Sequence, residues 1–219
     1  MLASEITLDL LLNAYASGFF PMSDDREDEA VFWVDPEERG IFPLEQFHLS
    51  KSLKKFIRKS LYKITYNQCF QTILQQCAMP AADRENTWIS HDIEALYCEL
   101  HAAGFAHSIE CWHGETLVGG LYGVCLNGCF FGESMFSRKT NASKVALAYL
   151  VARLKVGGFS LLDSQFQTEH LKSMGCIEVA RADYKMILNN ALQNTQADFY
   201  LLDDDTPAET ILQLITQIS

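Results

Sequence analysis

Three apolar β segments in the middle of the chain constrain the fold more than any other feature. They are separated by short turns and span 109–112, 116–125 and 129–134. Asn127-Gly128 stands between the second and third segments, and Asn-Gly between apolar runs is the strongest short-range signal of a hairpin. The sequence therefore predicts an antiparallel meander. Gly119-Gly120 inside its second strand predicts a bulge, or a ligand that approaches the backbone closely.

Helices are predicted on both sides of this meander, because apolar residues there recur at helical spacing. They span 8–15 after Thr7, 51–62 after Ser50, 68–79, 92–103, 141–155 with Asn141 as N-cap, 168–174 and 210–218. Shorter extended segments are predicted at 63–67, 159–162, 177–180 and 184–188. Acidic residues crowd 24–38, which predicts a solvated loop there.

The order of these elements predicts an α+β fold, with a mixed sheet flanked by helices. The period of the apolar pattern changes near 90–105. We therefore expect a smaller N-terminal α/β region at 1–86, which contains a basic helix, and a second domain at 87–219 with an acidic C-terminal extension.

The charge of the chain is strongly negative overall and positive in one place. A net charge of −11 argues against a protein that coats nucleic acid without selectivity, since such binding needs a positive surface. Six of the seventeen Lys and Arg residues nevertheless lie between 51 and 63, namely Lys51, Lys54, Lys55, Arg58, Lys59 and Lys63. They form either the solvated face of a helix or a surface that binds phosphates.

The cysteines and the N-terminus indicate a cytoplasmic protein. Seven cysteines are scattered without a C-x-x-C pair, which is typical of reduced core thiols and predicts neither a zinc site nor a redox pair. Glu5 and Asp9 precede or interrupt the first apolar run, unlike the basic start of a signal peptide. No stretch approaches the roughly 20 apolar residues of a membrane span.

Three polar residues are candidates for a site. Glu133 stands in an aromatic and sulfur-rich run at 130–137, where a carboxylate needs a partner or a ligand. Asp163 and Gln165 are two residues apart at the end of a predicted strand and should share a face. Alternatively, Glu133 bonds buried backbone groups and Asp163 caps the helix that follows.

A meander, a central helix, a strand, a short helix and a strand follow one another as in acyltransferases of the N-acetyltransferase (GNAT) superfamily. An acyl-CoA enzyme of that kind has a glycine-rich turn before the central helix, where backbone N–H groups hold pyrophosphate. The corresponding residues 138–142 contain no glycine, so an acyl-CoA N-acyltransferase stays only as an alternative.

Many ordered motifs resemble the leucyl/phenylalanyl-tRNA–protein transferase family across residues 8–188. They include Tyr15-x-x-Gly18-x-Phe20-Pro21, Trp33-x-x-Pro36, His48-Leu49-Ser50, Thr87-Trp88-Ile89, Gly132-Glu133-Ser134-Met135-Phe136-Ser137, Asn141-Ala142-Ser143-Lys144, Asp163-x-Gln165 and His170-Leu171. The resemblance implies transfer of leucine or phenylalanine, with methionine as a third candidate, from aminoacyl-tRNA to proteins with N-terminal Arg or Lys. The product carries an N-degron. No cofactor, metal or membrane is implied.

The resemblance also implies a role for each candidate residue. Asp163, Gln165 and Glu133 would be catalytic, and Trp88 and Met22 would contact the terminal adenosine. The pocket for the aminoacyl side chain would comprise Leu121, Phe130, Met135, Leu150, Leu154 and Leu162. Phosphates of the tRNA would meet Lys51, Lys54, Lys55, Arg58 and Lys59. A catalytically inactive module that binds tRNA or peptide is a further alternative.

Overall fold

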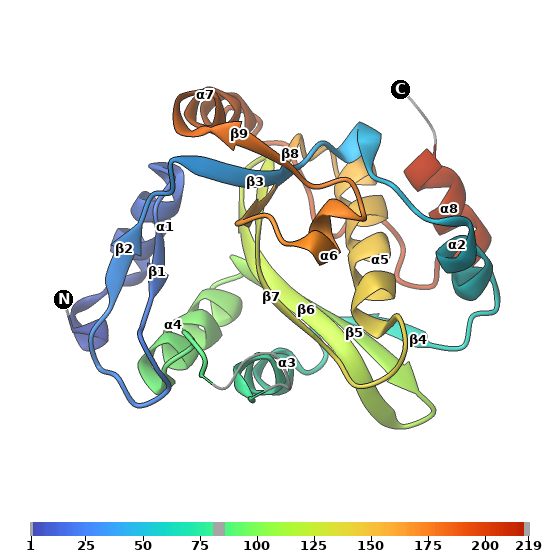
Figure 1. Ribbon diagram of the computed structural model, residues 1–219, viewed down its shortest axis with the longest axis horizontal. Helices are drawn as coiled ribbons and strands as arrows, with labels where there is room; N and C mark the ends of the chain where they lie inside the picture. The colour runs from blue at the N-terminus through green and yellow to red at the C-terminus, as the bar shows by residue number, and fades with distance from the viewer. Residues whose placement is uncertain (1, 81–85, 217–219) are drawn as a thin grey trace.

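The computed structural model describes residues 2–80 and 86–216, and a mixed sheet lies at its centre (Figure 1). Seven strands form this sheet within those ranges. In spatial order they are β4 (Lys63–Tyr66), β5 (Ala106–His113), β6 (Thr116–Leu126), β7 (Cys129–Ser137), β8 (Leu161–Gln165), β3 (Glu38–Phe42) and β9 (Ile177–Ala180). The predicted α+β class and the antiparallel meander are confirmed, the meander being β5, β6 and β7.

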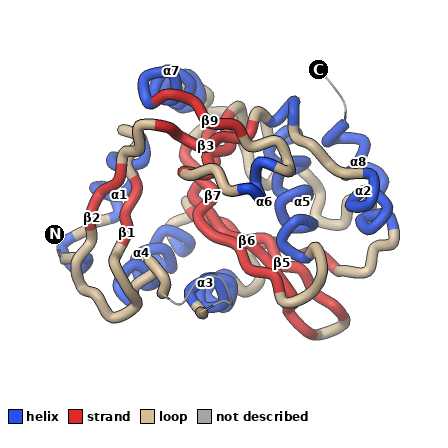
Figure 2. Tube along the Cα trace, in the orientation of Figure 1, coloured by secondary structure: helices blue, strands red, loops and turns tan. Residues whose placement is uncertain are grey.

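Only one pair of neighbours in this part of the chain is parallel. β7 and β8 run in the same direction and are connected through α5 (Ala142–Val156), whereas the other neighbours in the sheet are antiparallel. A separate ribbon pairs β1 (Phe20–Met22) with β2 (Phe32–Val34) beside the sheet (Figure 2).

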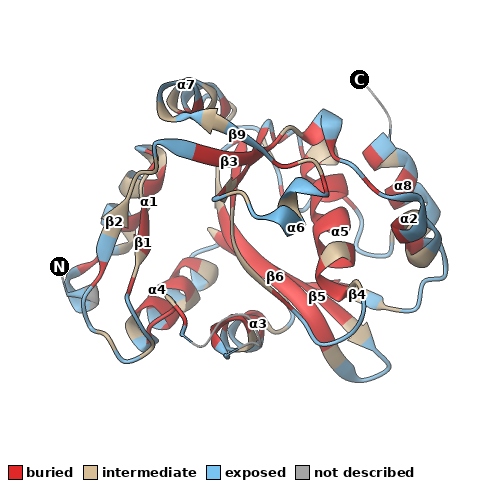
Figure 3. Ribbon diagram, in the orientation of Figure 1, coloured by how far each residue is buried: buried red, intermediate tan, exposed pale blue. Residues whose placement is uncertain are grey.

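Helices cover both faces of the sheet (Figure 3), and the sheet separates two apolar clusters of the core. One face carries α5, α2 (Lys51–Arg58) and α8 (Ala208–Thr216). The other carries α1 (Leu8–Ala16), α3 (Phe70–Ala78), α4 (His91–Ala102) and α7 (Arg181–Leu192). The short elements are η1 (Ala3–Glu5), η2 (Leu44–Gln46) and α6 (Glu169–Lys172). No helix in the described ranges has the length and apolar character to cross a membrane.

Side-chain caps start several helices where the sequence predicts them. The hydroxyls of Thr7 and Ser50 accept hydrogen bonds from the backbone of Leu10 and Leu53. The prediction that the side chain of Asn141 caps the helix that follows it is wrong. Asn141 has a left-handed backbone and makes no capping bond with its side chain.

Four other predictions need correction. Residues 24–38 are not only a loop, because Phe32–Val34 forms β2. Residues 184–188 are helical and belong to α7, since their tyrosine and leucine fill its buried stripe. The basic helix ends at Arg58, before 59–62. The strand predicted at 159–162 begins two residues later and extends to Gln165.

Gly119 allows α5 to approach the sheet closely. A Cβ atom there would lie 2.4 Å from that of Ala142, and one at Gly120 would lie 2.5 Å from Ile73 Cδ1. The predicted bulge is present beside them, where the β5–β6 register shifts between Cys111 and Trp112. The close neighbours of the two glycines are therefore α5, α3 and the backbone of the adjacent strands β5 and β7.

The C-terminal segment docks on α5 and α2. Ile211, Leu212 and Ile215 of α8 are buried in the cluster on that face. Arg153 of α5 is fully buried and donates to the carbonyl of Phe199 and to Asp204 Oδ1, at 2.9 and 2.6 Å. The acidic extension is thus part of the folded structure. β3 and β4 precede residue 86 and share the sheet with later strands, and a domain boundary at that residue stays a prediction.

Candidate active site beyond the β7–β8 pair

A cavity of about 340 Å³ lies where β7 and β8 stop pairing. Their pairing covers only Cys129–Phe131 and Leu161–Asp163, and the cavity opens beyond it. The lining residues are Phe20, Met22, Phe42, Trp88, Leu121, Tyr122, Gly132, Glu133, Ser134, Met135, Leu147, Leu150, Leu162, Asp163, Ser164, Gln165, Phe166, Thr168, His170 and Leu171. The end of the parallel pair thus supplies both polar and apolar walls.

A β-bulge places Glu133 in this wall. Tyr122 pairs with Ser134 and Gly123 pairs with Gly132, so Glu133 is an extra residue without a partner on β6. Bulges redirect side chains and are frequent beside active sites. Glu133 points toward α1 and α4, whereas Met135 packs with the cluster on the α5 side.

The Glu133 carboxylate is held by two tyrosines and one amide. It accepts hydrogen bonds from Tyr15 Oη at 2.7 Å, Tyr97 Oη at 3.0 Å and Gln165 Nε2 at 3.3 Å. Burial raises the pKa of Glu133 to about 7, although the tyrosine hydroxyls act in the opposite direction. A carboxyl with a pKa near neutrality can take up and release a proton at working pH.

The two tyrosines form a rigid buried support. Tyr15 and Tyr97 have no exposed surface and are hydrogen-bonded to each other through their hydroxyls. Burial and the nearby Glu133 raise the pKa of both phenols well above its usual value. Both therefore stay protonated. Each phenol has one proton, so the two protons serve three contacts, namely the one between the hydroxyls and one to each oxygen of Glu133.

Asp163 lies deeper than Glu133 and is enclosed by donors. Arg39 Nε lies 2.9 Å from Oδ1, while Arg39 Nη2 and Tyr184 Oη each lie 2.7 Å from Oδ2. The backbone N–H of Gln165 also donates to Oδ1, at 2.8 Å. Asp163 does not cap α6, whose first turn is capped by Thr168.

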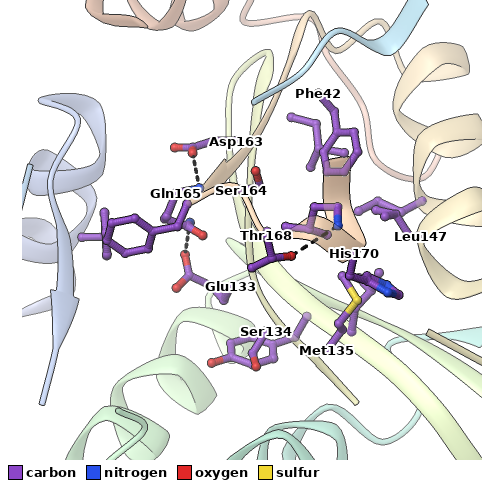
Figure 4. A pocket seen from close by; sticks show the side chains of 18 of the residues that line it. Phe42, Glu133, Ser134, Met135, Leu147, Asp163, Ser164, Gln165, Thr168 and His170 are labelled. Atoms are coloured by element: carbon purple, nitrogen blue, oxygen red, sulfur yellow. Dashed lines mark hydrogen bonds between the residues drawn. The ribbon is translucent and has the colours of Figure 1, made fainter. Parts of the chain in front are cut away.

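Gln165 connects the two carboxylates (Figure 4). Its backbone N–H points to Asp163, and its side-chain amide donates to Glu133. Its φ of 56° is left-handed, which is uncommon outside glycine, asparagine and aspartate. This conformation ends β8 and aims the side chain into the cavity.

Four of the six residues predicted to enclose the aminoacyl side chain line the cavity, and two do not. Leu121, Met135, Leu150 and Leu162 line the cavity. Phe130 and Leu154 are buried in the core and are not among the lining residues. The apolar wall also includes Phe42 and Leu147, which sequence reasoning missed, and Leu171, which belongs to a quoted motif without a predicted role. Leu147 lies one helical turn before Leu150, so the face of α5 could have revealed it.

Trp88 and Met22 both line the cavity. Met22 comes from the β1–β2 ribbon, and the backbone carbonyl of Trp88 accepts a hydrogen bond from Ser23 on the adjoining segment. Phe20 and Phe166 complete this wall, with their rings 5.7 Å apart.

The predicted phosphate surface lies on α2, outside the cavity. Lys51, Lys55, Arg58 and Lys59 are exposed and Lys54 is half-buried. Arg58 is bound to Glu209 of α8, with 2.9 Å between Nε and Oε2. The other four cations make no ion pair among the salt bridges of the described chain.

Sequence reasoning did not predict that Tyr97 supports Glu133, or that Arg39 and Tyr184 support Asp163. Arg39 follows two glutamates and reads as a surface charge. Tyr15 belongs to a quoted motif, and its spacing on α1 indicates a buried position without indicating a hydrogen bond. Among residues 2–80 and 86–216, no group of three His, Cys, Asp or Glu side chains is arranged to hold a metal ion.

Comparisons with known proteins identify the family. Residues 41–189 match the family described as leucyl/phenylalanyl-tRNA protein transferase, and residues 4–37 match its N-terminal domain. A protein of that name from Maricaulis maris is 54% identical over 209 residues, which cover 95% of this chain and 96% of the relative. Its counterpart from Zymomonas mobilis is 56% identical over 197 residues, which cover 90% of this chain and 72% of that relative. The one from Caulobacter vibrioides is 51% identical over 213 residues, or 97% and 98%. The chain therefore belongs to the leucyl/phenylalanyl-tRNA–protein transferase family.

Proposed function

We propose that this protein transfers leucine, phenylalanine or methionine from aminoacyl-tRNA to the α-amino group of proteins that begin with Arg or Lys. The observation that carries the proposal is one cavity with an apolar wall beside the Gln165–Glu133 pair. The names of its relatives support the same reaction. The product carries a new N-terminal residue that acts as an N-degron, and a charged tRNA as donor places the reaction in the cytoplasm.

The donor would occupy the cavity from two sides. Trp88 and Met22 would contact the terminal adenosine, while Leu121, Met135, Leu150 and Leu162 enclose the aminoacyl side chain. One methylene changes binding by only about 1–3 kcal/mol, so discrimination against Ile and Val must come from the shape of this wall. Phosphates of the tRNA body would bind to the cations of α2 and of its C-cap, namely Lys51, Lys54, Lys55, Arg58 and Lys59.

The polar wall would bring the acceptor amine to the ester. The Gln165 amide donates to Glu133, which leaves its oxygen to accept from the incoming amine. Glu133 would bind the ammonium and take its proton, after which the neutral amine attacks the ester carbonyl. The C–O bond to the ribose then breaks, and the amine passes a second proton to the ribose oxygen. The ester is already activated, so positioning supplies much of the rate.

The order of elements supports a GNAT-like catalytic domain. In this chain the parallel strands β7 and β8 are joined through α5 and diverge beside the candidate site. We propose that this divergence serves acyl transfer, with the region before residue 87 adding the tRNA-binding helix. Fold alone implies no substrate, so the proposal rests on the residues of the cavity.

Transfer of label from Leu-tRNA to a peptide with N-terminal Arg tests this function directly. The wild-type protein should label that peptide and leave an N-acetylated copy unlabelled. Gln165→Ala should lower the rate by roughly 10²-fold or more while tRNA still binds. Tight tRNA binding without transfer by the wild-type protein would instead indicate a binding module. Transfer from acyl-CoA alone would indicate the alternative enzyme.

A further inference from the structure

The carboxylate of Asp163 has no capacity left for a substrate. An ionised carboxylate offers about four acceptor sites. Arg39 Nε, Arg39 Nη2, Tyr184 Oη and the N–H of Gln165 all donate to it, at 2.7–2.9 Å in their shortest contacts. The side chains of Arg39 and Asp163 are both 0% exposed. An incoming amine would have to displace one of these buried donors to reach Asp163.

Arg39 is itself fixed on every side. Its guanidinium lies between the rings of Phe20 and Tyr184, at 4.6 and 4.5 Å from their centroids. Its Nη1 donates to the carbonyl of Gly18 at 3.0 Å. Burial opposes the charge of Arg39, but Asp163 outweighs it and raises the pKa of the guanidinium. The ion pair is thus a rigid unit that spans from the N-terminal segment to β8.

This unit controls the backbone of Gln165. Gln165 adopts a left-handed φ of 56°, which is unfavourable for a glutamine unless its surroundings hold it. The hydrogen bond from its N–H to Asp163 Oδ1 is the contact that secures this conformation. The conformation directs the amide of Gln165 to Glu133.

We propose that Arg39 and Tyr184 are positioning residues of the transfer reaction, which hold Asp163 as an anchor for Gln165 rather than as a proton acceptor. The inference rests on the proposed function and assigns its proton chemistry to the other carboxylate in the cavity. Asp163 keeps the same hydrogen bonds and the same charge throughout the reaction.

Tyr184→Phe and Arg39→Lys test this inference through kcat, KM and the pH profile. Tyr184→Phe removes one donor, and Arg39→Lys replaces the fork by a single ammonium. We expect kcat to fall by about threefold to tenfold in Tyr184→Phe and by about tenfold to hundredfold in Arg39→Lys, because a small misplacement of Gln165 slows attack. KM for the donor tRNA should change less than twofold, and the acid limb of the pH profile should stay in place.

The pH profile separates an anchor from a base. Tyr184 Oη donates a hydrogen bond to the Asp163 carboxylate, so Tyr184→Phe changes the surroundings of that carboxylate and leaves Glu133 in place. If Asp163 takes the proton, Tyr184→Phe displaces the acid limb of the profile, and that result overturns the inference. An unchanged kcat in both variants overturns it as well.

A paired substitution keeps the test independent of folding. Arg39→Gln alone leaves a buried carboxylate without its cation, and adding Asp163→Asn restores a neutral hydrogen-bonded pair. We expect the double variant to regain at least tenfold in kcat over Arg39→Gln. If Asp163 acts as a base, no such recovery can occur, because the Asp163→Asn substitution removes the base itself.

Arg153→Lys is the matched control. Arg153 is equally buried, stacks 3.6 Å from the centroid of Tyr66 and binds Asp204, but it lies outside the cavity. Its substitution should lower the melting temperature and leave kcat unchanged. Absence of transfer by the wild-type protein would refute the proposed function itself. An active wild type whose Tyr184→Phe and Arg39→Lys variants keep the same kcat would refute only this inference.

Discussion

Glu133 is an ionisable residue in a place where ionisation is costly, and the reaction should therefore depend on pH. Burial raises its pKa to about 7, and its ionised form is the one that can bind an ammonium. The α-amine of the acceptor has an ordinary pKa of about 7.7–8. Attack starts from ionised Glu133 and the ammonium form of the acceptor, so the rate should rise with pH around 7 and fall again above the pKa of the amine.

Glu133→Gln should remove one of these two titrations. We expect kcat/KM for the acceptor to fall by about 10²–10⁴-fold and its dependence on pH to become shallower, with only the amine titrating. Rates measured from pH 5.5 to 9 check this. Glu110→Gln is the control, because Glu110 is a buried carboxylate that bonds Thr65 and Ser108 and does not line the cavity. An equally steep profile in Glu133→Gln would contradict the assignment.

The same titration should affect stability with the opposite sign. The folded protein retains the proton on Glu133 up to about pH 7, whereas the unfolded chain loses it near 4.5. The free energy of unfolding therefore decreases as pH rises between these values, by on the order of 2–3 kcal/mol. Glu133→Gln should be more stable than the wild type at pH 8, and the difference should shrink toward pH 5. Urea denaturation at both pH values measures it.

At the scale of elements, α2 combines an apolar stripe with a cationic surface. Leu53 and Ile57 are buried against the core, and the cations lie on the outer side. Glu209 already occupies Arg58, so the lysines of this helix should contribute more to tRNA binding than the arginine does.

Lys54→Gln and Lys55→Gln should each weaken tRNA binding and reduce its dependence on salt. Each lost phosphate contact lowers the slope of log K against log salt by about 0.7–0.9. Glu209→Gln should instead increase affinity, because it releases Arg58. Filter binding at several salt concentrations measures all three. Lys185→Gln is the control. That lysine forms an ion pair with Asp35 and belongs to α7, which covers the opposite face of the sheet from α2 (Figure 1). An unchanged slope in both lysine variants would show that the cationic face of α2 is solvated and does not contact tRNA phosphates.

The contact between β6 and α5 depends on a missing side chain. In Gly119→Ala the new Cβ would lie 2.4 Å from that of Ala142, so helix and sheet would have to separate. We expect a loss of about 1–3 kcal/mol in the free energy of unfolding, measured with denaturant. Gly114→Asn is the control, because its turn has φ 61°, which asparagine tolerates, and open space around it. Equal stability of the two variants would show that α5 yields easily.

At the scale of the whole molecule, the C-terminal segment completes the core on the α5 face. Ile211 is 0% exposed and lies with α2 and α5 in one cluster. Ile211→Ala should cost about 2–5 kcal/mol of stability and leave kcat per folded molecule unchanged. Denaturation and active-site titration check the two parts. Gln213→Ala, on the exposed side of the same helix, should alter neither.

Local signals predicted the parts of the fold that depend on neighbours in sequence. Asn127-Gly128 fixes the turn between β6 and β7, and Thr7 and Ser50 start their helices. β3 escaped prediction because it pairs with β8 and β9 far along the chain. Residues 184–188 were misread because a short apolar pattern does not distinguish a strand from one face of a helix.

The sequence likewise predicts the polar residues of the site but not the residue that holds one of them in place. The sequence pattern indicates Glu133, Asp163 and Gln165 as candidates, the resemblance implies their catalytic roles, and the structure brings the three side chains together. It could not supply Arg39, which meets Asp163 across 124 positions and whose burial no local pattern announces. Strict alternation along a strand would also place Glu133 and Met135 on one face, and the bulge at Glu133 breaks that rule.

The bulge gives the site a length requirement as well as a composition. β6 and β7 would form an uninterrupted ladder if the chain were one residue shorter at Glu133. A deletion there would leave Ser134 and Met135 opposite Tyr122 and Leu121, join Gly132 directly to Ser134 and remove the carboxylate in a single genetic event. Insertions and deletions in this strand should therefore be absent from active descendants of this sequence, even where substitutions accumulate.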